Sequence, residues 1–143
     1  MACLVDTNIL VYRCDPRDPP KRAAATEVLR KGAASGQFHI CHQSLLEFVS
    51  VVTRSRAALM SPQDAARQAE FFIAQFPVLY PNEQQFRMAL YGFNTYRLSW
   101  FDAHLWAYAE HYGMSEILSE DFEHGRAYGS VTVRNPFLAY GLA

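Results

Sequence analysis

Four acidic residues of this chain lie at boundaries between its apolar segments, and they are Asp6, Glu47, Asp102 and Asp121. Carboxylates that meet within a few ångströms cannot all stay ionised without a cation. Ligands that are all oxygen select a hard ion such as Mg2+ or Mn2+, whereas Zn2+ favours His or Cys. Such an ion binds a phosphate oxygen, lowers the pKa of a bound water molecule and aligns it for in-line attack. If the four acids converge, they predict a site of one or two metal ions that acts on phosphate esters.

Two short apolar runs, which we interpret as strands, set the positions of Asp6 and Asp121. Asp6 comes directly after Cys3-Leu4-Val5, and Asp121 follows soon after Glu116-Ile117-Leu118. Apolar runs without alternation are typical of central parallel strands. The crevice of an open parallel sheet lies beyond the carboxyl ends of its strands, so both acids should reach the same edge. An Asx-turn or a helix cap is the ordinary alternative for Asp6.

Glu47 and Asp102 also have a structural alternative, because each is the last residue of a capping-box pattern. Ser44-Leu45-Leu46-Glu47 and Ser99-Trp100-Phe101-Asp102 both predict the start of a helix, where the acid can bond a backbone N–H. Asp64 follows Ser61 in the same setting, and we assign it no chemistry. Capping alone therefore does not distinguish the three acids. A short connection from the preceding strand favours the carboxyl edge for Glu47, whereas Asp102 is far from any strand in sequence.

Strands and helices alternate along the chain. We predict strands at about residues 4–5, 38–41, 78–80, 116–119 and 131–133. Helices are predicted at about residues 21–34, 44–56, 61–76, 82–96 and 99–113, and a proline-rich loop at 13–20. This alternation predicts an α/β fold with a parallel sheet covered on both faces. The length of 143 residues suits one compact domain spanning 1–143.

Charge, cysteine content and the lengths of the apolar runs limit the classes of protein to which this chain can belong. The net charge is −1, from 13 basic and 14 acidic side chains. Without the four candidate acids the balance is 13 basic to 10 acidic, so a neutral total can hide an acidic pocket in a mildly basic surface. Cys3, Cys14 and Cys41 form no CxxC pair, and we interpret them as small buried residues. No secretion signal or membrane-spanning run is evident, which predicts a cytoplasmic protein without membrane contact.

The segments around the four acids resemble, in the same order, those of PIN domains of the VapC-like toxin type. These segments are Val5–Tyr12, Gln43–Phe48, Ser99–Ala103 and Leu118–Gly125, and Val133–Phe137 resembles one branch of that family. Each motif is weak by itself, but four in the right order are fairly specific. His104 is a mild departure, because an aliphatic residue is expected at its position.

The resemblance implies a single PIN domain with a three-layer α/β/α sandwich and a short, mainly parallel sheet of four to five strands. It implies an endoribonuclease that depends on Mg2+ or Mn2+ and hydrolyses RNA with a metal-activated water molecule. It also implies a homodimer and a small cognate antitoxin that neutralises the toxin. The acidic site of the family maps onto Asp6, Glu47, Asp102 and Asp121, as catalytic residues and metal ligands. Its small polar residues map onto Thr7, Asn8 and Ser119, which would support the ligands, although ordinary turn and cap bonding is the alternative.

Contacts with the RNA substrate are predicted less directly. Arg13 follows the first strand and should lie near the edge of the site. Arg54, Arg56 and Arg97 are further candidates, and an ordinary solvated arginine is the alternative for each. Phosphate contacts would make binding sensitive to salt.

Two other functions remain open at this stage. The chain could be a PIN nuclease of housekeeping RNA processing that has no antitoxin. It could also be a non-catalytic PIN-fold module that binds RNA or a protein. The presence of all four acids argues against the second of these alternatives.

Overall fold

A computed structural model describes residues 1–142, and a six-stranded sheet forms its centre. The strands are β1 (Cys3–Val5), β2 (Phe38–Cys41), β3 (Val78–Leu79), β4 (Glu116–Leu118), β5 (Ala127–Tyr128) and β6 (Val131–Arg134). Their order in the sheet is β3-β2-β1-β4-β6-β5. All neighbouring strands are parallel except β5, which pairs with β6 in the antiparallel sense. The first strand therefore lies in the middle of the sheet.

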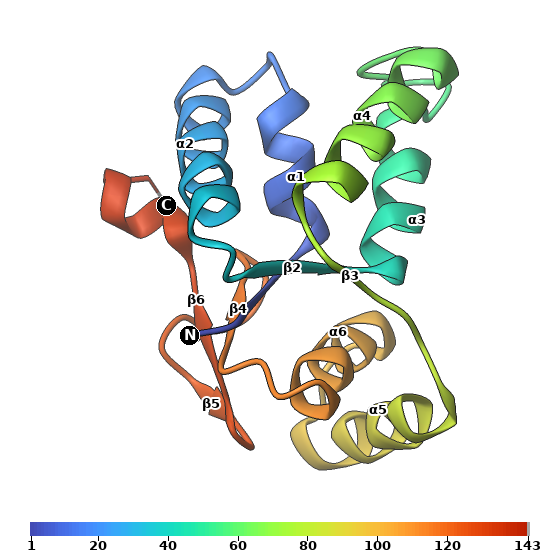
Figure 1. Cartoon of the computed structure of the whole chain (residues 1–143), viewed down its shortest axis with the longest axis vertical. Coiled ribbons are helices and arrows are strands. Elements are labelled where there is room, and N and C mark those ends of the chain that lie inside the picture. Colours follow the sequence, from blue (N-terminus) through green and yellow to red (C-terminus); the bar gives the residue numbers. More distant parts are fainter. Residues whose placement is uncertain (143) are drawn as a thin grey trace.

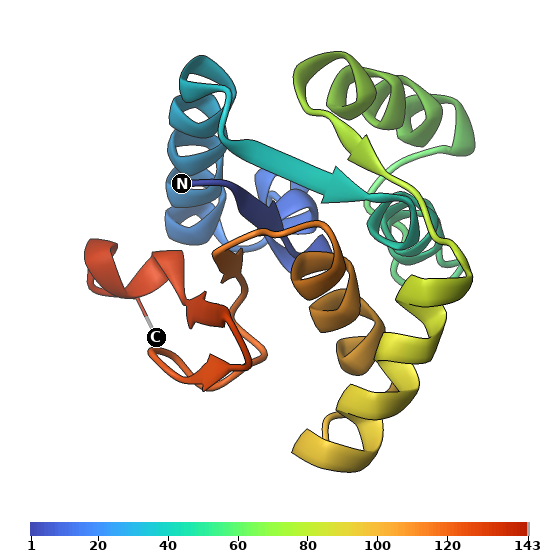
Figure 2. The same cartoon turned by 60° about the horizontal axis from the view of Figure 1, so that its bottom comes forward.

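Helices cover both faces of this sheet (Figure 1). One face carries α1 (Thr7–Cys14), α2 (Pro19–Ser35), α3 (His42–Val52), α4 (Pro62–Gln75) and the short 3-10 helix η1 (Pro136–Tyr140). The other face carries α6 (Trp100–His111), with α5 (Glu83–Tyr96) packed on its outer side. Figure 2 shows α6 beside the sheet and α5 farther out. These layers confirm the predicted α/β/α sandwich.

Alternate residues of β1 pack into the hydrophobic core on opposite faces of the sheet. Cys3 and Val5 pack with α1 to α4, whereas Leu4 packs with α5, α6 and Ile117 of β4. Residues of a strand point alternately to opposite faces, so an apolar run is required where both faces are covered. The uninterrupted apolar sequence of β1 thus results from its central position.

The sheet has six strands rather than the predicted four to five. The additional strand, β5, is two residues long and is the antiparallel edge next to β6. A segment of that length has no periodicity that could predict a strand.

Within residues 1–142, no helix combines the length and the apolar character that crossing a bilayer requires.

Two predicted element boundaries are wrong. The loop predicted at 13–20 is present but shorter, at 15–18, because α1 continues to Cys14 and α2 begins at Pro19. Ser44 does not cap a helix, since α3 begins at His42 and ends at Val52. The Ser44 hydroxyl is instead buried within 3.4 Å of the Cys41 sulfur. At this second place, β2 runs into α3 without a linker.

Candidate active site

A pocket of about 340 Å3 lies where β1 and β4 end, and all four predicted acids line it. Asp6 and Asp121 come from the segments after these two strands, Glu47 from α3 and Asp102 from the first turn of α6. Parallel strands β1, β2 and β4 bring their carboxyl ends to one edge, and α1 and α3 start there. The fold therefore gathers four carboxylates that are far apart in sequence.

Asp6 is fixed by hydrogen bonds on both of its carboxylate oxygens. Its Oδ1 accepts a bond of 2.6 Å from the backbone N–H of Thr7 and caps α1. Its Oδ2 accepts a bond of 2.6 Å from the hydroxyl of Ser119. The backbone N–H of Asp6 donates to the carbonyl oxygen of Leu118, the last residue of β4. Asp6 is thus a helix cap and a pocket residue at once, so the two interpretations do not exclude each other.

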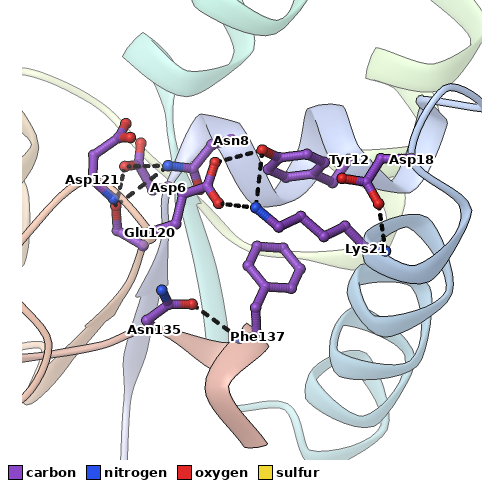
Figure 3. Close-up of polar contacts among 10 residues, drawn as sticks. Asp6, Asn8, Tyr12, Asp18, Lys21, Glu120, Asp121, Asn135 and Phe137 are labelled. Atoms are coloured by element: carbon purple, nitrogen blue, oxygen red, sulfur yellow. Dashed lines mark hydrogen bonds and ion pairs between the residues drawn. The ribbon is translucent and has the colours of Figure 1, made fainter. Parts of the chain in front are cut away.

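Small polar residues surround Asp6. The amide nitrogen of Asn8 lies 3.4 Å from both Asp6 Oδ2 and Ser119 Oγ, and Ser119 Oγ accepts a bond from the backbone N–H of Asp121. Among the described residues, Thr7 Oγ1 and Asn8 Oδ1 are buried without a hydrogen-bond partner. Buried polar atoms usually have partners, so these two oxygens suit a water molecule or a bound group. Figure 3 shows the contacts of Asp6 and Asn8.

Glu47 and Asp102 differ in their relation to helix capping. Glu47 lies in the second turn of α3, so the capping interpretation is wrong for it. Its Oε1 accepts a bond of 2.7 Å from the Gln43 amide, which also donates to the carbonyl oxygen of Phe101. Asp102 is the third residue of α6, and its backbone N–H bonds the capping hydroxyl of Ser99, as predicted. Gln43 thereby joins Glu47 to the turn that carries Asp102.

Burial and mutual repulsion perturb these carboxylates. Burial raises the pKa of Asp6 to about 7, the charges of Asp121 and Asp102 add to the increase, and the bonds from Ser119 and Thr7 oppose it. Burial also raises the pKa of Asp102, and the charge of Asp121 adds to it. A carboxylate becomes harder to ionise when it is desolvated and when other carboxylates are near. A cation in the pocket would relieve both effects.

Charge compensation divides the acids of the pocket into two sets. Two further acids line it, and each has a basic partner: Asp15 pairs with Arg17 at 2.9 Å and Glu120 with Lys21 at 2.8 Å. Within residues 1–142, no ion pair involves any of the four predicted acids. The uncompensated charge of the pocket therefore coincides with the predicted metal ligands.

The four carboxylates face one pocket but do not converge into a ready set of metal ligands. Among the described residues, no group of three or more His, Cys, Asp or Glu side chains is arranged to hold a metal. The donor set is nonetheless all oxygen and uncompensated, which suits Mg2+ or Mn2+. A bound ion would require these side chains to move toward one another.

The predicted position of Arg13 is wrong. Arg13 is in the last turn of α1, not in a loop, and it does not line the pocket. Its guanidinium donates to Gln68 of α4 at 2.8 Å and lies over the ring of Phe71. The basic residue that does line the pocket is Arg17, at its rim.

Several residues of the pocket were not predicted from the sequence. They are Tyr12, Asp15, Arg17, Gln43 and Glu120, with Lys21 bonded to Glu120 behind the wall. Helical spacing could have indicated Tyr12 and Gln43, which are one turn from Asn8 and Glu47 on α1 and α3. The pairings with Arg17 and Lys21 have no comparable signal in the pattern.

Comparison with known families identifies the fold. The model of the PIN domain family matches residues 3–129. The chain belongs to the PIN domain family. The match includes all four carboxylates of the pocket, so the acidic edge described above is the edge of a PIN domain. No curated protein is a significant match to the chain.

Solved structures with the same architecture include toxin proteins. A toxin–antitoxin complex from Klebsiella pneumoniae has a TM-score of 0.68 at 16% identity, covering 94% of this chain and 98% of that one. VapBC2 from Rickettsia felis, bound to a promoter DNA fragment, has a TM-score of 0.70 at 13% identity, with coverage of 94% and 98%. VapC20 of Mycobacterium tuberculosis, a Sarcin-Ricin loop cleaving toxin, has a TM-score of 0.65 at 15% identity, with coverage of 84% and 90%. At such identities the likeness shows the PIN fold alone.

Proposed function

We propose that this PIN domain is an endoribonuclease that depends on Mg2+ or Mn2+ and hydrolyses phosphodiester bonds of RNA. The observation that carries the proposal is the uncompensated charge of the pocket. Asp6, Glu47, Asp102 and Asp121 line one pocket of a PIN fold without basic partners among the described residues, whereas the other two acids are paired. Such a carboxylate set is suited to a hard divalent ion and poorly suited to an organic anion.

Asp6, Glu47, Asp102 and Asp121 would hold the ion, and the residues behind them would orient the ligands. When bound, a divalent ion polarises a phosphate oxygen and lowers the pKa of a water molecule. Ser119 and Asn8 hold Oδ2 of Asp6, and Gln43 holds Oε1 of Glu47. Hydrogen bonds of this kind behind metal ligands fix their orientation.

Arg17 is the residue that we propose to contact an RNA phosphate in place of Arg13. Two of its guanidinium nitrogens are held at 2.9 Å by the carboxylate oxygens of the buried Asp15. The side chain of Arg17 is 63% exposed at the rim of the pocket. A fixed and exposed guanidinium suits a phosphate group.

A toxin of a toxin–antitoxin pair is the biological role that we propose. It is supported by the similar folds, which include a toxin–antitoxin complex and a toxin that cleaves the Sarcin-Ricin loop. We propose on the same basis that the chain acts in the cytoplasm as a homodimer and binds a small antitoxin. A small reading frame beside the gene, whose product suppresses cleavage by this protein, would support this role over housekeeping RNA processing.

Cleavage of single-stranded RNA by the purified protein tests the catalytic proposal. We expect cleavage with Mg2+ or Mn2+, its loss with EDTA, and a loss of at least about 100-fold in Asp6→Asn and Asp102→Asn, because metal ligands act together. Circular dichroism of both variants controls for folding. If the wild type cuts no RNA with either metal, or if both variants cut as fast as the wild type, the proposal fails and a binding module becomes the better description.

A further inference from the structure

Lys21 forms an ion pair with Glu120, a residue of the pocket wall. Lys21 is in the first turn of α2, and its Nζ lies 2.8 Å from Oε2 of Glu120, which follows β4. The hydroxyl of Tyr12 donates a bond of 2.7 Å to Oε1 of the same carboxylate. Figure 3 shows the Glu120 carboxylate between Tyr12 and Lys21. Both carboxylate oxygens of Glu120 are therefore occupied.

Aromatic rings and a helix cap hold the Lys21 side chain in place. Its ammonium group lies 4.8 Å from the ring centre of Tyr12 and 5.2 Å from that of Phe137. Its backbone N–H bonds the side chain of Asp18, the cap of α2. Only 15% of the Lys21 side chain and 19% of the Glu120 side chain are exposed. Surface ion pairs fluctuate and contribute little, but this pair is mostly buried and held on several sides.

The position of Glu120 relative to the candidate metal ligands makes this pair important. Glu120 directly precedes Asp121 and lines the same pocket. Ser119, on its other side, bonds both Asp6 and the backbone N–H of Asp121. A Glu120 carboxylate without its partner would therefore be a fifth uncompensated acid at a site where four are gathered.

We propose that Lys21 is a positioning residue that neutralises Glu120 and keeps its carboxylate out of the metal site. The inference rests on the proposed function, because it concerns which carboxylates hold the divalent ion. Lys21 touches neither the ion nor the substrate in this scheme. It acts through Glu120 and determines that four carboxylates of the pocket, not five, lack a basic partner.

Two variants that break the same ion pair should change metal affinity in opposite directions. Lys21→Met leaves an additional negative charge at the pocket, and we expect about fivefold tighter binding of Mn2+ to the RNA-free protein. Glu120→Gln leaves an additional positive charge, and we expect about fivefold weaker binding. Isothermal titration calorimetry with Mn2+ alone measures both. A purely structural role of the pair predicts weaker binding in both variants, because each loses the same contact.

RNA cleavage at saturating Mn2+ gives the second measurement. We expect Lys21→Met to cleave about tenfold more slowly, because the freed Glu120 carboxylate competes with the four ligands for the ion. The double variant Lys21→Met/Glu120→Gln should recover cleavage and Mn2+ affinity to within about twofold of the wild type. Lys21→Arg keeps the charge and should also stay close to the wild type. Lys31→Met is the matched control, since Lys31 is on the same helix but pairs with exposed Glu27.

Three results would overturn the inference while the proposed function stands. The first is a wild type that binds Mn2+ and cuts RNA while Lys21→Met behaves like Lys31→Met. The second is a decrease in Mn2+ affinity in both Lys21→Met and Glu120→Gln. The third is a double variant that cleaves as slowly as Lys21→Met. If Lys21→Met does not fold, unchanged Mn2+ affinity in Glu120→Gln also overturns it. A wild type that neither binds Mn2+ nor cuts RNA would reject the proposed function itself.

Discussion

Ser119 donates a hydrogen bond of 2.6 Å to Asp6, a residue 113 positions earlier in the chain. This bond opposes the increase that burial causes in the pKa of Asp6. In Ser119→Ala the pKa of Asp6 should therefore rise further, and RNA cleavage should decrease most below pH 8. We expect the acidic limb of the pH–rate profile to move to higher pH by about one unit, since a hydrogen bond to a charged group contributes about 1.5–3 kcal/mol.

Ser115→Ala is the control for this experiment. The Ser115 hydroxyl also bridges β1 and β4, by donating to the carbonyl oxygen of Ala2 at the opposite end of the strands. Ser115→Ala therefore removes a comparable hydrogen bond that does not involve a carboxylate. Equal shifts of the pH profile in both variants would contradict the role given to Ser119.

The raised pKa of Asp6 also predicts a pH-dependent stability of the metal-free protein. An unfolded aspartate titrates near pH 4, whereas burial raises the pKa of Asp6 in the folded chain to about 7. Between these values the folded state binds a proton that the unfolded state does not, so stability decreases as the pH rises from about 4 to 7. We expect this contribution to be about 4 kcal/mol, because the two pKa values differ by about three and each pKa unit corresponds to about 1.4 kcal/mol.

Urea unfolding in EDTA at pH 5 and pH 8 measures this effect. The free energy of unfolding of the wild type should be lower at pH 8, and that of Asp6→Asn should change much less, because asparagine does not titrate. Saturating Mn2+ should restore the stability of the wild type at pH 8, since ligand binding to the folded state stabilises it. An equal pH dependence in both proteins would show that another group causes it.

Asp102 and Asp64 form a matched pair for separating catalysis from helix capping. Each is the third residue of a helix whose capping serine accepts its backbone N–H, at 3.2 Å in Ser99 and 3.1 Å in Ser61. Asp102 lines the pocket, whereas Asp64 pairs with Arg67 on the surface. Asp64→Asn should lower stability by only about 0.5 kcal/mol through the helix dipole, whereas Asp102→Asn should not lower it, because burial and the charge of Asp121 disfavour the ionised Asp102 carboxylate.

Their effects on activity should differ sharply. Asp102→Asn should reduce RNA cleavage by at least about 100-fold, as expected for a metal ligand, and should weaken Mn2+ binding in calorimetry. Asp64→Asn should leave both unchanged. If the two variants lose activity to the same extent, the contribution of Asp102 is that of a helix terminus.

Arg17 and Arg13 provide a similar comparison for RNA binding. Arg17→Ala should raise the KM for RNA about fivefold and should reduce the salt dependence of binding by about one phosphate contact. Arg13→Ala should change neither, because Arg13 is bound to Gln68 and lies over Phe71, away from the pocket. Titration of RNA at several salt concentrations measures both. A larger effect of Arg13→Ala on RNA binding would support the prediction from the sequence that Arg13 lies at the edge of the site.

Local patterns in the sequence predict those elements whose signals are local. The strand at 38–41 has the observed bounds, and Ser61 and Ser99 cap the helices that they were expected to cap. Ser44 has the same pattern but fails, because β2 runs directly into α3 and the first residues of that pattern are already helical. A capping box describes one turn of chain and contains no information about the strand before it.

The site was predictable to the extent that it depends on strand ends. Asp6 and Asp121 follow two parallel strands, so their common edge follows from the topology. The pairing of Lys21 with Glu120 joins residues 99 positions apart and depends on how α2 packs beside β4, which no local pattern encodes. The prediction for Arg13 was wrong for a related reason. A loop was expected there, and a loop does not fix the direction of a side chain, whereas the observed helix does.

The pairing of β1 with β4 also determines when the pocket can form during synthesis of the chain. Asp6 is made 113 residues before Ser119, and β1 pairs with β4 across that separation. Such distant contacts form only after most of the chain is available and its loops have closed. A nascent chain still within the ribosome therefore has no assembled carboxylate pocket. The activity that we propose would therefore arise only after Ser119 and Asp121 have left the ribosome.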